Sequence, residues 1–206
     1  MATAAARDQS DVPAVRGTAI PPARVATAAM IGTAIEWYDF FVYGTSTVLV
    51  LGPLFFPSGN HLVSSLLAFS AFGIGFLVRP VGALVLSHWG DRYGRKNTLV
   101  VALLLMGGAT FAVGILPTYG EIGIWAPALL VLLRCVQGFA VGGEWGGAVL
   151  LAVEHAPAQR RAWYGSFPQY GLPFGLATSS LAILGASELS GDQFLAWGWR
   201  LPFLFS

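Results

Sequence analysis

Long apolar segments joined by short polar connectors constrain this chain more than any other feature. A helix needs about 20 apolar residues to cross the hydrocarbon core of a bilayer. Five segments meet this requirement, and a sixth apolar run opens near Phe194 and reaches Ser206. The predicted spans are 25–51, 62–87, 98–116, 125–153, 163–187 and 194–206, the last of which is incomplete. This pattern predicts an all-α integral membrane protein.

The composition excludes several other classes of protein. Hydrophobic residues make up 55% of the 206 residues and charged residues only 10%, against about 25% charged in an average soluble domain. So few charges cannot cover the surface of a soluble globular enzyme. A net charge of +1 gives no electrostatic support for a nucleic-acid partner. The histidines show no metal-ligand spacing, so we expect no metal site.

The distribution of basic residues predicts how the chain crosses the bilayer. Residues 1–24 form a tail that lacks the pattern of a signal peptide. If this tail is cytoplasmic, eight basic residues lie inside and only Arg200 lies outside, as the positive-inside rule requires. The inner residues are Arg7, Arg16, Arg24, Arg92, Arg95, Lys96, Arg160 and Arg161. We expect a multi-pass protein of the cell inner membrane with a cytoplasmic N-terminus, and an incomplete sixth span predicts a fragment.

Five ionisable residues lie inside the predicted spans: Glu36, Asp39, Arg79, Arg134 and Glu144. A charge at the bilayer centre costs about 2.5–3.5 kcal/mol on insertion scales. Such residues rarely face lipid. They form structural ion pairs, or they line a polar pathway for substrate and ions. The usual role of intramembrane charges favours the pathway.

The depths of these charges suggest which of them lie together. Glu36 and Asp39 are three residues apart and share one helix face. Glu36 lies about 17 Å from the inner end of its span and Arg134 about 14 Å from the outer end. Both positions are near the middle of a core about 30 Å thick. We therefore expect Glu36, Asp39 and Arg134 in one layer, and Arg79 with Glu144 as a second intramembrane charge pair.

The residue types in the first layer suggest chemical roles. A planar guanidinium can bind a carboxylate through two hydrogen bonds, so Arg134 is the candidate for holding a substrate carboxylate. A substrate anion that competes for Arg134 would release a carboxylate to take up a proton. Glu36 and Asp39 are therefore the candidates for proton coupling. No nucleophile–base pair is visible, so we expect no catalytic residues and no enzyme.

Glycines recur every four residues at Gly138, Gly142 and Gly146 in the fourth predicted span. Rows of small residues at this spacing allow two helix backbones to approach closely. A phosphate-binding loop is the rival interpretation. It is disfavoured because no strand precedes these glycines and no Gly-Lys-Ser/Thr follows them.

Several motifs resemble those of the major facilitator superfamily. Gly90-Asp91-Arg92-Tyr93-Gly94-Arg95-Lys96 resembles the signature loop between helices 2 and 3 of that superfamily, with Ser87 in place of its leading glycine. Arg134–Gly138 is similar to a second motif in helix 4, and Glu154–Arg161 to a Glu-x-x-Pro-x-x-x-Arg element after it. Three further stretches resemble the metabolite–proton symporter family, which includes permeases for shikimate, 2-oxoglutarate, citrate and proline or betaine. They are Glu36–Phe40, Val78–Pro80 and Gln137–Gly147.

The resemblance covers residues 25–206 and implies a fold and a function. It implies a twelve-helix transporter made of two six-helix halves, of which this chain is the N-terminal half and the C-terminal half is missing. It implies proton-coupled symport of a small organic acid or zwitterionic metabolite by alternating access, without a bound cofactor. An uncoupled facilitator and another major facilitator transporter, such as a sugar transporter, remain the alternatives.

The resemblance also implies further site residues. Tyr38 and Gln137 lie in the family-like stretches, and we expect them to bind the substrate together with Arg134. A cytoplasmic gate is expected to hold the inner side shut in the outward-facing state. Its predicted members are the charged residues Asp91, Arg92, Arg95, Glu154 and Arg161.

Overall fold

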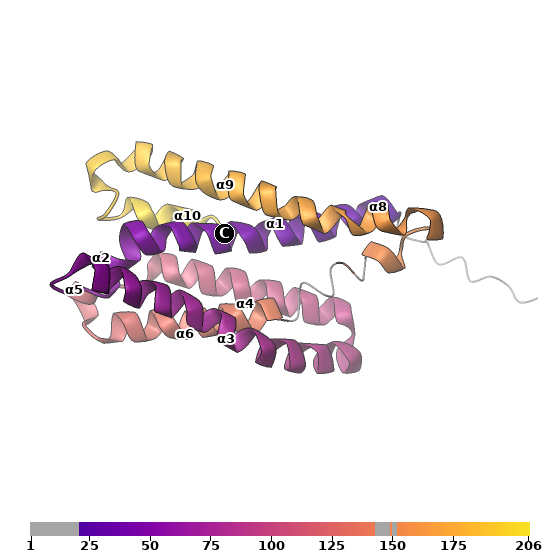
Figure 1. Ribbon diagram of the computed structural model, residues 1–206, viewed down its shortest axis with the longest axis horizontal. Coiled ribbons are helices and arrows are strands. Elements are labelled where there is room, and N and C mark those ends of the chain that lie inside the picture. Colours follow the sequence, from indigo (N-terminus) through magenta and orange to yellow (C-terminus); the bar gives the residue numbers. More distant parts are fainter. Residues whose placement is uncertain (1–20, 143–148, 150–151) are drawn as a thin grey trace, which may run out of the picture.

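The computed structural model describes residues 21–142, 149 and 152–206. This part of the chain contains helices and turns and no strand. Consecutive long helices run in opposite directions between the two ends of an elongated bundle (Figure 1). Five helical segments of the described chain are long and apolar enough to cross a membrane: Pro22–Phe55, His61–Tyr93, Asn97–Ile115, Trp125–Gly142 and Ala158–Gln193. The predicted all-helical membrane fold is confirmed.

The helices follow one another along the chain with short connections. They are α1 (Pro22–Ser46), α2 (Gly52–Phe55), α3 (His61–Tyr93), α4 (Arg95–Ile115), α5 (Tyr119–Ile122), α6 (Trp125–Gly142), α8 (Arg161–Gly165), α9 (Phe167–Ser190) and α10 (Leu201–Leu204). A π-helical turn, Thr47–Leu51, joins α1 to α2. Short 3₁₀ turns occupy Ala158–Arg160, Gly191–Gln193 and Gly198–Arg200.

The first span extends beyond its predicted end at residue 51. The sequence Gly52-Pro53 suggests a turn, but both residues lie in α2, which continues directly from the π-helical turn. A proline inside a continuous helix removes one backbone hydrogen bond, and Pro53 lies directly after the π-helical turn, in which the Gly52 N–H donates to the Thr47 carbonyl oxygen. The chain leaves the helix at Phe56, and Asn60 begins the next one, its Oδ1 accepting from the Leu62 N–H at 2.8 Å.

A single glycine connects α3 to α4. Gly94 has φ +92° and is both the C-cap of α3 and the N-cap of α4. This conformation is open to glycine and strained for other residues. It allows α3 to run past the predicted end at residue 87 as far as Tyr93 and then reverse at once.

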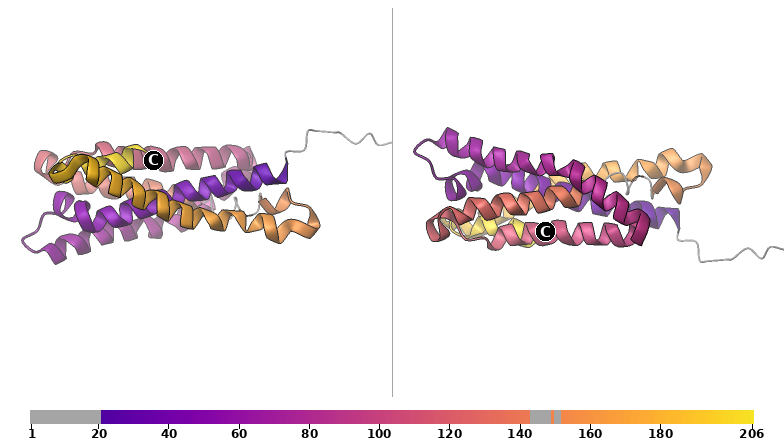
Figure 2. Two further views of the ribbon diagram at one scale, coloured as in Figure 1. Left: turned by 90° about the horizontal axis from the view of Figure 1, so that it is seen from above. Right: turned by 90° about the horizontal axis from the view of Figure 1, so that it is seen from below.

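The helices pack in two groups (Figures 1 and 2). α9 lies along α1 in one group, and α3 lies along α6 with α4 beside them in the other. α3 and α6 approach each other closely, because a Cβ placed on Gly138 would overlap the carbonyl group of Gly75. The predicted role of the glycine row in close helix packing is therefore seen at Gly138. Gly146 lies outside the described residues.

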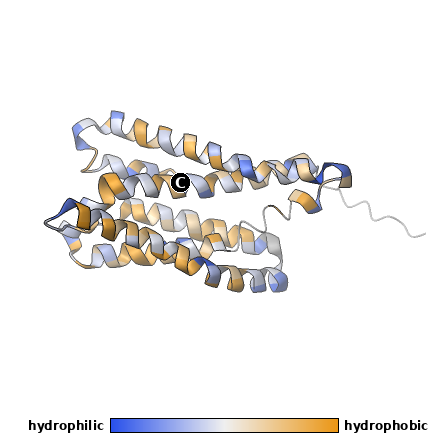
Figure 3. Ribbon diagram, in the orientation of Figure 1, coloured by the Kyte–Doolittle hydropathy of each residue, from blue (hydrophilic) through white to orange (hydrophobic). Residues whose placement is uncertain are grey.

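Apolar side chains join the two groups at the end where α2, α5 and α10 lie. Val42, Leu51, Phe55, Trp199 and Phe203 belong to this core cluster and are fully or almost fully buried. Hydrophilic residues gather at the two ends of the bundle, and apolar residues dominate the helices between them (Figure 3). The outer faces of the helices carry large exposed apolar side chains, as a helix in contact with lipid does.

Candidate functional site

A small polar cavity lies inside the bundle between α1, α3, α4 and α6. Its volume is about 30 Å³, enough for one water molecule. Four charged side chains and Gln137 line it together with apolar residues. The lining residues are Glu36, Asp39, Phe40, Phe72, Gly75, Phe76, Arg79, Met106, Arg134, Gln137, Gly138 and Val141. The fold therefore brings together the intramembrane charges of three different helices.

A larger cleft of about 390 Å³ adjoins this cavity. Glu36, Phe76, Arg79 and Val141 line both spaces, so Glu36 and Arg79 lie where the larger cleft meets the smaller cavity. Asp39 and Arg134 line only the smaller cavity. The two acidic residues of α1 consequently have different access to the outside of the bundle.

Asp39 is 4% exposed and accepts a hydrogen bond on each carboxylate oxygen. The hydroxyl of Thr110 on α4 donates to Oδ2 at 2.7 Å, and the hydroxyl of Ser206 donates to Oδ1 at 2.5 Å. Thr110 in turn accepts a hydrogen bond from Gln137 Nε2 of α6 at 2.6 Å. A continuous hydrogen-bond chain therefore connects α1, α4 and α6.

Arg134 is held by aromatic rings. Its guanidinium carbon lies 2.9 Å from the ring centroid of Tyr43 and 5.3 Å from that of Phe72, which is a cation–π arrangement. The Arg134 side chain forms no ion pair with any described residue, and its buried Nε and Nη2 atoms have no hydrogen-bond partner there. The Nε and Nη2 atoms of Arg134 are thus available to an acceptor in the cavity.

Glu36 and Arg79 form the second set of charges. Arg79 interacts electrostatically with Glu36 and lies over the ring of Phe76 at 4.4 Å from its centroid. No direct ion pair joins these two described side chains, and neither Glu36 Oε2 nor Arg79 Nε has a hydrogen-bond partner among the described residues. Arg79 was expected in a separate layer with Glu144. The structure places it beside Glu36, and Glu144 lies outside the described residues.

Tyr38 and Gln137 occupy different positions. Gln137 lines the cavity, and its buried Oε1 has no hydrogen-bond partner among the described residues. The Tyr38 hydroxyl donates to the carbonyl oxygen of Pro202 at 2.7 Å, and Tyr38 is not among the residues that line the cavity or the cleft. Tyr38 therefore joins α1 to the α10 segment.

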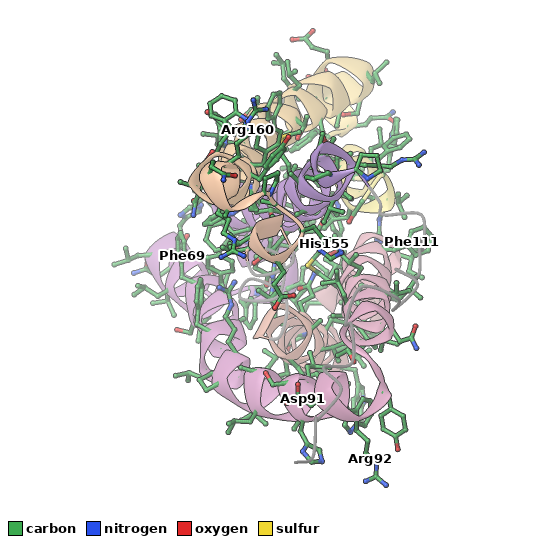
Figure 4. All side chains as sticks on the ribbon, turned by 90° about the vertical axis from the view of Figure 1, so that its right-hand side faces the viewer. Phe69, Asp91, Arg92, Phe111, His155 and Arg160 are labelled. Carbon is green, nitrogen blue, oxygen red and sulfur yellow. The ribbon has the colours of Figure 1, made fainter. Side chains whose placement is uncertain are left out.

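The predicted gate residues lie at the end of the bundle where α1 begins. Asp91 and Arg92 are in the last turn of α3, and Arg161 is the first residue of α8. Seen from this end, Asp91 and Arg160 lie on opposite sides of the bundle, with His155 between them (Figure 4). Glu154 is exposed, and the side chain of Arg95 is outside the described part of the structure.

Sequence reasoning did not identify Thr110, Ser206, Tyr43 or Phe72. A lone threonine or aromatic residue is common in an apolar span, so the sequence around it does not indicate that it contacts a charged residue. Among the described residues, no group of three or more His, Cys, Asp or Glu side chains is placed to hold a metal ion.

Known proteins resemble this chain over nearly its whole length. Residues 25–206 match the sequence profile of the family described as "Sugar (and other) transporter". The inner membrane metabolite transport protein YhjE of Escherichia coli K12 is 51% identical over 184 residues, which are 89% of this chain and 42% of that protein. The shikimate transporter of the same organism is 50% identical over the same shares of both chains. The proline/betaine transporter of E. coli K12 is 40% identical over 181 residues, which are 87% of this chain and 36% of that protein.

The fold has a solved counterpart. The structure of the xylose transporter XylE from E. coli, in a partially occluded inward-open conformation, matches with a TM-score of 0.76 at 20% identity. The match covers 90% of this chain and 46% of that one. The chain spans less than half the length of the relatives it matches, and it corresponds to their N-terminal half. The chain therefore belongs to the sugar (and other) transporter family of the major facilitator superfamily.

Proposed function

We propose that the protein containing this chain is a proton-coupled symporter of a small organic acid or zwitterionic metabolite. It works by alternating access in the inner membrane, with its N-terminus in the cytoplasm. The observation that carries this proposal is Arg134, a buried arginine that stacks on Tyr43 and Phe72 while two of its donor atoms have no partner in the described protein.

A buried guanidinium whose Nε and Nη2 atoms have no hydrogen-bond partner among the described residues is costly, and a substrate carboxylate would satisfy both atoms. Stacking on the aromatic rings fixes the plane of the Arg134 guanidinium and leaves its edge available for two parallel hydrogen bonds. Gln137 Oε1, in the same cavity, can accept from a hydroxyl or amine group of the substrate. The residues that we assign to substrate binding are therefore Arg134 and Gln137, and Tyr38 serves to hold α10.

The names of the relatives agree with a carboxylate ligand. One 50% identical relative is named a shikimate transporter and a 40% identical one a proline/betaine transporter. Shikimate, proline and betaine each carry one carboxylate, although the rest of each molecule differs. An arginine that binds the shared group, next to a variable remainder of the site, suits this range of substrates.

Uptake by the full-length protein tests the substrate site. Radiolabelled shikimate, 2-oxoglutarate, citrate, proline and glycine betaine form the panel, and Arg134→Gln is compared with Arg160→Gln. Arg160 is an exposed arginine at the end of the bundle and serves as the matched control. We expect Arg134→Gln to reach the membrane and to lose at least about tenfold in uptake, because a charge-assisted bidentate contact is lost. Uptake equal to that of the control would remove Arg134 from the site.

Asp39 and Glu36 are the residues that we assign to proton coupling, because both are buried carboxylates beside Arg134 or Arg79. Asp39→Asn or Glu36→Gln should preserve exchange of substrate across the membrane while reducing accumulation driven by a pH gradient. A purely structural role predicts something different, since removing one partner of a buried charge set costs about 3–5 kcal/mol and would lower the amount of folded protein. If both variants are produced normally and still concentrate substrate, neither residue couples to protons.

An uncoupled facilitator is the second candidate function. Its support is that both oxygens of Asp39 already accept hydrogen bonds, as they would in a structural carboxylate. Uptake with and without a proton uncoupler separates the two functions. A symporter stops accumulating substrate above the external concentration when the proton gradient collapses, whereas a facilitator never accumulates it.

A further inference from the structure

The hydroxyl group of Thr110 lies between a buried carboxylate and the cavity. Thr110 is 1% exposed, donates to Asp39 Oδ2 at 2.7 Å and accepts from Gln137 Nε2 at 2.6 Å. The other end of the Gln137 amide, Oε1, lines the cavity and has no partner in the described protein. The hydrogen-bond chain from Asp39 through Thr110 to Gln137 is thus open at its cavity end.

We propose that Thr110 is a positioning residue that couples occupation of the substrate site at Gln137 to protonation of Asp39. This inference rests on the proposed function, since it takes Asp39 as a proton-coupling group. Thr110 itself touches neither the substrate nor solvent, and it acts through the two side chains that it joins.

A hydroxyl group suits this position because it can reverse its hydrogen bonds by rotation. A threonine hydroxyl has one proton to donate and two lone pairs that accept. Besides Asp39, Thr110 has a second acceptor, the Met106 carbonyl oxygen, at 3.1 Å. While Asp39 is ionised, Thr110 donates to its carboxylate. After Asp39 has taken up a proton from water, the new O–H donates to Thr110 Oγ1, and the Thr110 proton turns to Met106.

Gln137 can donate to Thr110 in both states, because the hydroxyl oxygen accepts from two donors. Asp39 Oδ2, Thr110 Oγ1 and Gln137 Nε2 therefore each keep a partner whether or not Asp39 carries a proton. A substrate group bound at Gln137 Oε1 reorients the amide and with it the Nε2–H that Thr110 accepts. This shift favours one direction of the hydroxyl over the other and so one protonation state of Asp39.

Other titratable or charged groups surround Asp39 and act on the same equilibrium. Glu36, Tyr38 and Tyr43 lie on α1 with it, Arg134 faces it from α6, and Arg79 borders the same cavity from α3. α4 contributes the Thr110 hydroxyl and the α10 segment the Ser206 hydroxyl. Besides Asp39, the Thr110 hydroxyl is bonded to Gln137, a described residue that lines the cavity.

The test compares variants of Thr110 in the purified full-length protein. Thr110→Val removes the hydroxyl at nearly constant volume, Thr110→Cys substitutes a weak donor, and Thr110→Ser keeps the hydroxyl. Thr33→Val is the matched control, because Thr33 is a buried threonine of α1 whose hydroxyl bonds only to the Ala29 carbonyl oxygen of its own helix. Asp39→Asn in the same series tests the proposed function separately.

Two measurements are made on each variant. In the first measurement, accumulation in proteoliposomes under a pH gradient is compared with exchange at equal concentrations, once with shikimate and once with glycine betaine. The other measurement is infrared difference spectroscopy on a change of pH, without substrate. In this spectrum the carbonyl stretch of the protonated Asp39 is the band that Asp39→Asn removes. This band reports the hydrogen bonds of Asp39 directly and does not depend on the choice of substrate.

We expect Thr110→Val and Thr110→Cys to lower accumulation at least about fivefold with exchange retained within about twofold, the effect of one hydrogen bond to a charged group. The Asp39 band should shift in both variants, whereas Thr110→Ser and Thr33→Val should match the parent in both measurements. If Thr110→Val does not reach the membrane, the accumulation and the Asp39 band of Thr110→Cys decide whether Thr110 takes part in coupling.

Two results would overturn the proposal, and they are distinguishable. If Asp39→Asn abolishes coupling but Thr110→Val and Thr110→Cys accumulate substrate like the parent with an unshifted band, Thr110 has no part in coupling and the proposed function stands. If Asp39→Asn itself leaves both the accumulation and the infrared spectrum unchanged, Asp39 is not the proton site and both proposals fail.

Discussion

A methyl group added at Gly138 should separate the two helices that carry Arg79 and Arg134. A Cβ at this position would lie 2.7 Å from the Gly75 carbonyl carbon and 2.9 Å from its Cα, and closer still to the carbonyl oxygen. Ordinary van der Waals contact begins near 3.4 Å. All three atoms belong to the backbone, so no side chain can rotate away, and Gly138→Ala must move α3 and α6 apart by about 1 Å.

The cost of this displacement can be estimated. Overpacking of a close helix contact costs about 1–3 kcal/mol. Alanine also gains about 1 kcal/mol over glycine in helix propensity, which opposes the cost. Gly73→Ala is the matched control, because Gly73 lies in α3 two residues before Gly75 and a Cβ at Gly73 meets no atom within 4 Å. Both variants gain the same propensity, so the difference between them isolates the overlap with Gly75.

The assay is thermal unfolding of the detergent-solubilised full-length protein, followed by the fraction that remains monodisperse in size-exclusion chromatography. We expect Gly138→Ala to unfold about 1–5 °C below Gly73→Ala, since 1 kcal/mol shifts the midpoint by about 2–4 °C in a protein of about 150–250 residues and by less in the longer full-length protein. Equal midpoints would show that α3 and α6 do not touch at Gly75 and Gly138. The description of the cavity between them would then be wrong as well.

Three further predictions concern the ends of the bundle. Arg200→Ala should lower the unfolding temperature by a few degrees in the same assay, because Arg200 Nη1 donates to the carbonyl oxygens of Gly114 (2.9 Å) and Leu116 (2.8 Å) at the end of α4; Arg200→Gln, which keeps a donor, should lose less. A membrane-impermeant thiol reagent applied to intact cells should label Gly59→Cys and spare Lys96→Cys, and the reverse result would invert the proposed topology. Asp91→Asn should reduce uptake at normal protein levels if the charges near the start of α4 form a gate, and unchanged uptake would leave them only a role in topology.

Features that depend on local sequence were predicted well. The five long spans are confirmed, because length and hydropathy decide whether a segment can cross a bilayer, and neither requires knowledge of its neighbours. Their ends were less accurate. α3 continues to Tyr93, where Gly94 with its positive φ ends it, and α2 includes Gly52 and Pro53 because the helix of the first span continues through the π-helical turn.

The composition of the cavity was partly predictable as well. A charged residue in an apolar span must face the interior, so Glu36, Asp39, Arg79 and Arg134 could be identified without a structure, and all four line the same cavity. The rise per residue also places Glu36 and Arg134 at similar depths. Depth, however, is only one of the three coordinates that decide which side chains meet.

The tertiary structure decided the partners of these charges. Arg134 lies against the rings of Tyr43 and Phe72 and also interacts electrostatically with Asp39, as depth suggested, whereas Arg79 lies beside Glu36. Thr110 reaches Asp39 from a helix 71 residues away along the chain, and its sequence surroundings are those of any apolar span. The lateral position and rotation of each helix depend on contacts between distant residues, such as the approach of Gly138 to Gly75, and these contacts follow from the packing of the whole bundle.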